Sequence, residues 1–121
     1  MSTQTTFLAV FLGSQTSARM QDWKALDDDT RKAREQEGMA AWQAWTERHS
    51  DAIVEIGGPL GKTRRVSADG IEEVSNALGG FSIVRAESHE AAAKLFEDHP
   101  HYTIFPGDAV EVMPILSIPD M

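Results

Sequence analysis

The stretch from Leu78 to Ile115 constrains the fold of this chain most strongly. Its apolar runs and helix signals predict, in order, a strand, a helix and a second strand, over residues 81–86, 89–97 and 110–113. Ser88 is a good N-cap for this helix, and Pro100 ends it. The connection to the second strand contains His99 and His101, so the stretch predicts a βαβ unit with a histidine-bearing loop.

The run Phe7 to Leu12 predicts the first strand, and it is apolar on both faces. Phe7, Ala9 and Phe11 point one way, and the residues between them point the other way. Both faces must therefore be covered, and helices of this chain can cover one of them. A chain of 121 residues has few segments left for the other face, so we expect a homodimer.

Between the first strand and the βαβ unit, the sequence predicts two helices, a strand and a hairpin. They cover residues 16–26, about 29 to 48 or 49, 52–56, and part of 66–74. Asp27, Asp28 and Asp29 provide an N-cap and an acidic first turn for the long helix. The predicted order is β-α-β-β-α-β, which indicates an α+β, ferredoxin-like fold with an antiparallel sheet and residues 1–121 as one domain.

One stripe of the long helix carries large side chains at helical spacing: Met39, Trp42, Trp45 and His49, with Gly38 beside them. Such stripes are most often core that packs against a sheet. The alternative is that Trp42 or Trp45 forms the floor of a ligand pocket, with His49 nearby.

Composition excludes several classes of function. Eleven basic residues against nineteen acidic ones give a net charge of -8, which disfavours binding to nucleic acid or to anionic lipid. The chain has no cysteine, which excludes disulfides, thiolate metal sites and cysteine nucleophiles. The apolar run 7–12 is too short for a signal peptide or a membrane span. We therefore expect a cytoplasmic protein.

His99 and His101 are the residues best suited to chemistry, because imidazole acts as an acid, a base or a metal ligand near neutral pH. A metal would need a third ligand, such as Asp98, Glu97 or His49, and we predict no metal and no cofactor. Asp98 or Asp51 could orient an imidazole. The structural alternative is that His99 caps a helix end and His101 packs against Tyr102 or a loop carbonyl.

Several motifs resemble those of the YCII-related proteins, which belong to the dimeric α+β-barrel superfamily. They are Leu78-Gly79-Gly80-Phe81, Ala91-Ala92, His99-Pro100-His101, Phe105-Pro106-Gly107 and the strand Val110 to Pro114. The resemblance implies homodimers whose sheets pack face to face. Some members resemble a dehydrochlorinase that acts on hydroxylated aromatic rings, with a proposed catalytic His-Asp pair. This chain has His99 at the aspartate position, preceded by Asp98, and Ala41 or Trp42 at about the histidine position.

Two hypotheses of function follow. The first is a cofactor-independent lyase or isomerase, dehydrochlorinase-like, that acts on a small cyclic or aromatic molecule. His99 and His101 would move the proton, with Asp98, and Trp42, Trp45 and His49 would bind the ligand. The second is a non-catalytic dimer that binds a small molecule or serves as an accessory protein. An enclosed pocket beside the histidines favours the first hypothesis, and solvent-exposed histidines favour the second.

Overall fold

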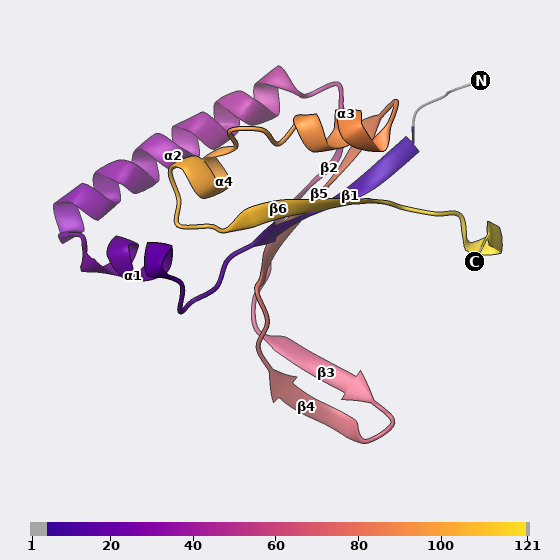
Figure 1. Cartoon of the computed structure of the whole chain (residues 1–121), viewed down its shortest axis with the longest axis horizontal. Coiled ribbons are helices and arrows are strands. Elements are labelled where there is room, and N and C mark those ends of the chain that lie inside the picture. The colour runs from indigo at the N-terminus through magenta and orange to yellow at the C-terminus, as the bar shows by residue number, and fades with distance from the viewer. Residues whose placement is uncertain (1–4, 121) are drawn as a thin grey trace.

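The computed structural model describes residues 5–120 and shows an antiparallel sheet with helices packed against one face (Figure 1). The strands are β1 (Thr5–Leu12), β2 (Ile53–Pro59), β3 (Thr63–Ser67), β4 (Gly70–Val74), β5 (Leu78–Ala86) and β6 (Ala109–Pro114). The helices are α1 (Ala18–Ala25), α2 (Asp28–Arg48), α3 (His89–Lys94), α4 (Pro100–Thr103) and the 3-10 turn η1 (Ile118–Asp120).

Four strands form the main sheet in the order β2-β5-β1-β6, and every neighbouring pair is antiparallel. With α2 after β1 and α3 after β5, this is the βαββαβ arrangement of a ferredoxin-like fold. The predicted fold class is therefore confirmed. Strands β3 and β4 form a separate two-stranded sheet within the connection from β2 to β5.

The two-sided character of β1 explains its central place. Phe7 and Ala9 pair with Val84 and Ser82 of β5, and all four side chains are buried. They lie on the face that the helices cover, as the strand alternation predicts. The buried core of that face consists of Phe7, Ala9, Phe11, Trp45, Val84, Ala86, Ala92 and Phe96.

Helix α2 lies across the covered face. The inward stripe of large side chains that was predicted for this helix is wrong at one turn, the one that contains Met39. Trp45 is buried and Trp42 is half-buried, but Met39 is 67% exposed. The inward position of that turn belongs to Gly38, because a Cβ there would lie 2.5 Å from Cε2 of Phe105. The close approach of the Phe105 ring thus turns Met39 toward solvent.

The second predicted helix is shorter than its sequence pattern indicates. Ser88 caps α3 as predicted, since its hydroxyl accepts a hydrogen bond from the Ala91 amide at 3.0 Å, but α3 ends at Lys94. After Asp98, which has a φ of 55°, a new turn of helix begins at Pro100. Proline fits the first position of a helix, so Pro100 starts α4. The prediction that Pro100 ends the second helix is wrong, because α3 already ends at Lys94.

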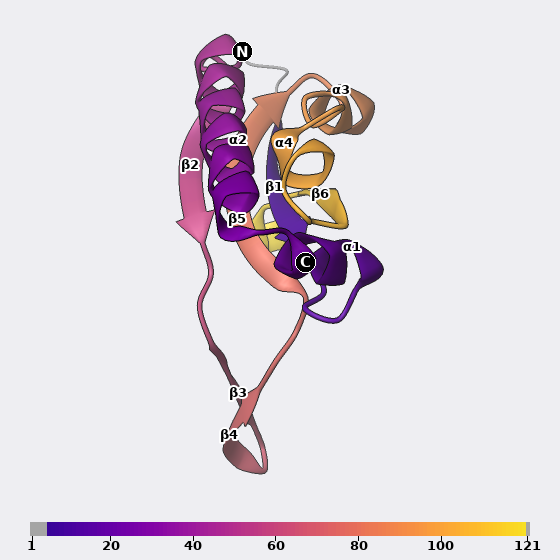
Figure 2. The same ribbon diagram turned by 90° about the vertical axis from the view of Figure 1, so that its left-hand side faces the viewer.

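The opposite face of the sheet is bare of helices in the part of the chain that the structure describes, although Val10 on this face is buried and Leu8, Phe81 and Ile83 are half-buried. It carries the alternate side chains of three strands: Leu8, Val10, Phe81, Ile83 and Met113. Figure 2 shows α2 in front of the sheet and the β3–β4 hairpin extending beyond the ends of β2 and β5. Among the described helices, none is both long and apolar enough to cross a membrane.

Candidate functional site

The histidine loop folds inward, so that His99 becomes part of the core. Its side chain is 0% exposed, and it stands at the N-cap of α4. Nδ1 of the imidazole accepts a hydrogen bond from the backbone N–H of His101 at 3.0 Å. The imidazole therefore satisfies one of the free amides of the helix start, a role that Asn, Asp or Ser usually fills.

Four aromatic rings surround the His99 imidazole. The ring of Trp42 is edge-on at 4.5 Å between centroids and that of Trp45 at 4.7 Å. Phe11 and Phe96 complete the cage at 5.2 Å and 5.8 Å. Trp42 is the half-buried member of this imidazole cage, whereas the other three rings are buried. Trp42 is therefore the ring of the cage that is most exposed to solvent.

The hydrogen bond at Nδ1 fixes the tautomer of His99. Because Nδ1 accepts, the proton of the neutral ring is on Nε2. Nε2 is buried and has no hydrogen-bond partner among residues 5–120. A buried donor without an acceptor costs about 1–3 kcal/mol, so it calls for an explanation. A ligand oxygen placed beside Nε2 would accept this hydrogen bond.

Burial also decides the charge of His99. Burial first, and then the positive charges of protonated His101 and His49, together lower the pKa of His99 from 6.5 to about 3. The imidazole is therefore neutral throughout the physiological pH range. A group in this state donates a hydrogen bond from Nε2 and does not exchange protons with solvent near neutral pH.

His101 faces the end of β1. Its Nε2 lies 2.7 Å from the Leu12 carbonyl oxygen, and because a carbonyl only accepts, Nε2 carries the proton. Gly107 makes this contact sterically feasible, since a Cβ at that position would lie 2.3 Å from Nε2. Burial lowers the pKa of His101, while the Leu12 carbonyl and the Asp108 carboxylate oppose the shift. His101 thus contacts a carbonyl at the end of a strand, and not Tyr102 or a loop carbonyl as expected.

The remaining predicted site residues divide into two groups. Trp45 donates its indole N–H to the Leu95 carbonyl at 2.7 Å, and His49 packs against the Trp45 ring at 5.4 Å. Burial, followed by the charge of Arg48, lowers the pKa of His49. Asp98 is exposed, and among the described hydrogen bonds it makes none to an imidazole. The fold thus brings together Trp42, Trp45, His49, His99 and His101, and leaves Asp98 outside.

Sequence reasoning did not place Phe11 and Phe96 at this site. Both residues were expected in the core, from strand alternation and from the apolar face of the second helix. Their contacts with His99 depend on how the loop after α3 turns back over β1. No local spacing reports that turn.

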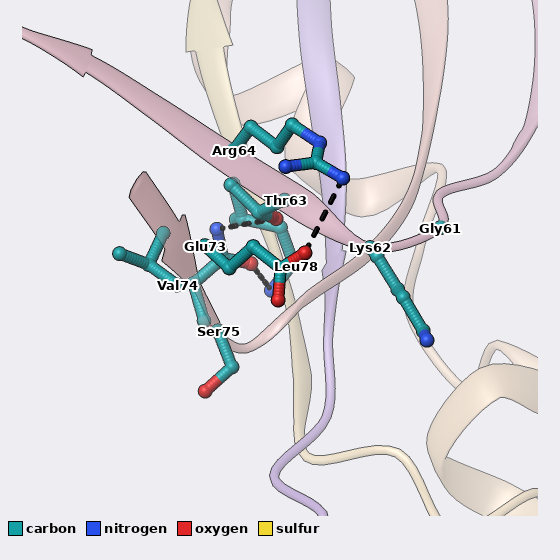
Figure 3. Close-up of a pocket in the computed structure, with 9 residues that line it drawn as sticks. Gly61, Lys62, Thr63, Arg64, Glu73, Val74, Ser75 and Leu78 are labelled. Carbon is teal, nitrogen blue, oxygen red and sulfur yellow. Dashed lines mark hydrogen bonds and ion pairs between the residues drawn. The ribbon is translucent and has the colours of Figure 1, made fainter. Parts of the chain in front are cut away.

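Two surface hollows are present, and His99 lines neither of them. One, of about 350 Å³, lies at the base of the β3–β4 hairpin (Figure 3). Its lining includes the ion pair Arg64–Glu73, with 3.2 Å between the charged atoms. The other, of about 300 Å³, lies between α3 and β6 and includes Phe96, Tyr102 and Asp108. No group of three or more metal-ligating side chains occurs within residues 5–120.

Comparison with solved structures supports the fold. The chain is similar to 5-chloro-2-hydroxyhydroquinone dehydrochlorinase (TftG) from Burkholderia phenoliruptrix AC1100, solved in complex with 2,5-dihydroxybenzoquinone. The TM-score is 0.51 at 20% sequence identity, over 89% of this chain and 90% of the other. No family model matches the sequence. No curated protein matches it either. A likeness at this identity establishes a shared fold.

Proposed function

We propose that this protein is a homodimeric α+β-barrel protein that binds a small planar molecule bearing an oxygen acceptor. The observation that carries the proposal is the buried Nε2–H of His99, which has no acceptor inside a cage of aromatic rings. The motifs that resemble YCII-related proteins and the fold shared with a dehydrochlorinase support the same class of ligand.

The cage determines how such a ligand binds. The flat faces of Trp42 and Trp45 suit a planar ring, and the His99 Nε2–H provides one directed hydrogen bond. Because His99 stays neutral, it recognises a carbonyl or phenolate oxygen without a change of charge. Binding requires the half-buried Trp42 ring to move aside, so the ligand takes over its contact with His99.

The homodimer follows from the uncovered sheet face. Its apolar side chains come from β1, β5 and β6, and two such faces bury each other when the sheets pack together. We expect sedimentation at micromolar concentration to show a dimer. Met113→Glu, which places a charge on this face at an edge strand, should dissociate it. A compact wild-type monomer under these conditions would exclude the dimer.

The binding proposal is tested with 2,5-dihydroxybenzoquinone, the ligand in the dehydrochlorinase structure, by titration calorimetry. His99→Asn keeps a side-chain oxygen at the N-cap but removes the Nε2 donor. We expect it to weaken binding about tenfold or more, the effect of one lost hydrogen bond. His89→Asn, which removes an exposed imidazole that contacts the Val112 carbonyl, is the matched control. Equal affinities in wild type and His99→Asn would contradict the proposed contact.

A second candidate is the cofactor-independent lyase or isomerase. The similarity of fold to a dehydrochlorinase favours it. In such a reaction a neutral imidazole N–H stabilises negative charge that develops on a substrate oxygen. His101 would then move the proton. Chloride release from 5-chloro-2-hydroxyhydroquinone above the uncatalysed rate, lost in His99→Asn, would support catalysis. Binding without release would leave the protein as a binding or accessory dimer.

A further inference from the structure

The β3–β4 arm, residues 63–74, stands apart from the rest of the chain. Its two strands pair only with each other in the described sheets, and Figures 1 and 2 show the arm extending past the end of the main sheet. A two-stranded hairpin is marginally stable by itself in water. An arm of this kind therefore requires either a packing partner or strong internal contacts.

The end of the arm is apolar and exposed. Val66 and Ile71 lie directly opposite each other in the register, and they are 74% and 69% exposed. Their side chains share one face of the hairpin with the Arg64–Glu73 ion pair, while Arg65 and Glu72 occupy the other face. One face of the arm thus presents a directly paired valine and isoleucine to solvent, beside a single ion pair.

The charge of the arm differs from that of the chain. The segment 61–75 contains three basic and three acidic side chains, whereas the chain as a whole carries -8. A neutral arm approaches another acidic copy without the repulsion that the rest of the surface would cause. It also lacks the basic excess that binding to a nucleic acid or an anionic membrane requires. Its charge therefore favours a second copy of this chain as the partner.

The direction in which the arm extends also favours a second copy of this chain as its partner. In Figure 1 the arm bends away from α2, toward the side of the sheet on which the C-terminal segment also extends. That segment carries the exposed side chains of Leu116 and Ile118, and the sheet on that side has its bare apolar face. A second copy seated on the bare face lies within reach of the arm.

We infer that the β3–β4 arm clasps the second copy, with Val66 and Ile71 packed against its surface. This inference rests on the homodimer of the proposed function and specifies a contact outside the sheet face. By twofold symmetry each copy contributes one arm, so the pair is clasped from both sides.

The test compares two double variants by sedimentation equilibrium. Val66→Ser with Ile71→Ser removes the apolar pair, and we expect the dimer dissociation constant to rise at least tenfold. Arg65→Ser with Glu72→Ser changes the opposite face of the same strands and leaves the net charge unaltered, so its dissociation constant should stay within about twofold of wild type. A dimer that is equally stable in both variants overturns the clasp while the homodimer stands. A wild-type monomer overturns both proposals.

A second measurement applies even if the serine variant loses its hairpin. Because the chain has no cysteine, Val66→Cys introduces a single thiol at the arm. Its reaction with a thiol reagent should be at least tenfold slower at protein concentrations above the dissociation constant than below it. Lys24→Cys on the exposed side of α1 should react at the same rate at both concentrations. A Val66→Cys rate that is independent of concentration overturns the clasp.

Discussion

The imidazole cage and the β3–β4 arm place their large side chains in opposite environments. Around His99, rings from β1, α2 and the segment after α3 meet one another, and Trp45 is 3% exposed. On the arm, Val66 and Ile71 lie opposite each other across the hairpin and are 74% and 69% exposed. Contacts between segments that are distant in the sequence stabilise the cage, whereas the pairing of β3 with β4 stabilises the arm.

The difference indicates where the chain supplies its own partners and where another molecule must. Burial in the cage stabilises the fold and leaves one donor, the His99 Nε2–H, for a small ligand. Exposure on the arm contributes little to the fold and leaves apolar surface for a large partner. The cage therefore lacks an acceptor for the His99 donor, and the arm lacks a surface that would cover its apolar pair.

Truncation of one large side chain in each region should give the largest difference between the cage and the arm, measured as the loss in the free energy of unfolding. Trp45→Ala opens a cavity beside His99, and large-to-small changes of this kind cost about 3–5 kcal/mol. Val66→Ala removes an exposed side chain, and its effect on the free energy of unfolding should be about 0.5 kcal/mol or less. Urea unfolding followed by circular dichroism, at a protein concentration below the dissociation constant of the dimer, gives both values. Similar losses in the two variants would show that the arm is as well packed as the cage.

Sequence patterns predicted the elements of both regions but not their surroundings. The alternation of Phe7, Ala9 and Phe11 predicted a strand that is apolar on both faces, and the structure shows that β1 lies in the interior of the sheet. The spacing of Trp42 and Trp45 indicated an inward stripe on α2. Met39 shared that spacing and is exposed, because the Phe105 ring takes the inward place beside Gly38.

The residues of the candidate site could be predicted from the sequence, but their contacts and their burial could not. His99 and Trp42 were each identified from the sequence, but the 4.5 Å contact between them depends on how the loop folds against α2. Loop conformation is set by tertiary contacts that local propensity does not report. The same holds for the neutral state of His99, which follows from burial and not from residue type.

Acid should weaken the cage and leave the arm unaffected. The unfolded chain protonates His99 below its ordinary pKa of 6.5, but the folded chain does so only near its lowered pKa of about 3. The unfolded state therefore binds more protons in this window, and the free energy of unfolding falls with decreasing pH. Between about pH 7 and pH 5, His99 alone should remove roughly 2 kcal/mol of stability.

Comparison with His99→Asn isolates this contribution. The variant lacks the imidazole, so its free energy of unfolding should change less steeply with pH over the same range. The difference between the two slopes should approach the value for one bound proton. Burial also lowers the pKa values of His101 and His49, and these residues should produce the smaller dependence that remains. Urea titrations at several pH values provide the slopes. Identical slopes for wild type and variant would mean that His99 is not protected from protonation.

The smallest expected effect concerns the two ion pairs of the arm, which lie on its opposite faces and so show which face a second copy covers. Arg65 and Glu72 are 61% and 58% exposed, and they lie on the face opposite Val66. A double-mutant cycle, read from hydrogen exchange of β3 amides, should give a coupling of about 0.5 kcal/mol or less at any protein concentration. Arg64 and Glu73 share the face of Val66, so a second copy would remove water from them. Their coupling should therefore increase as the protein concentration passes the dissociation constant of the dimer. Couplings that are equal and independent of concentration would show that both faces of the arm remain in water.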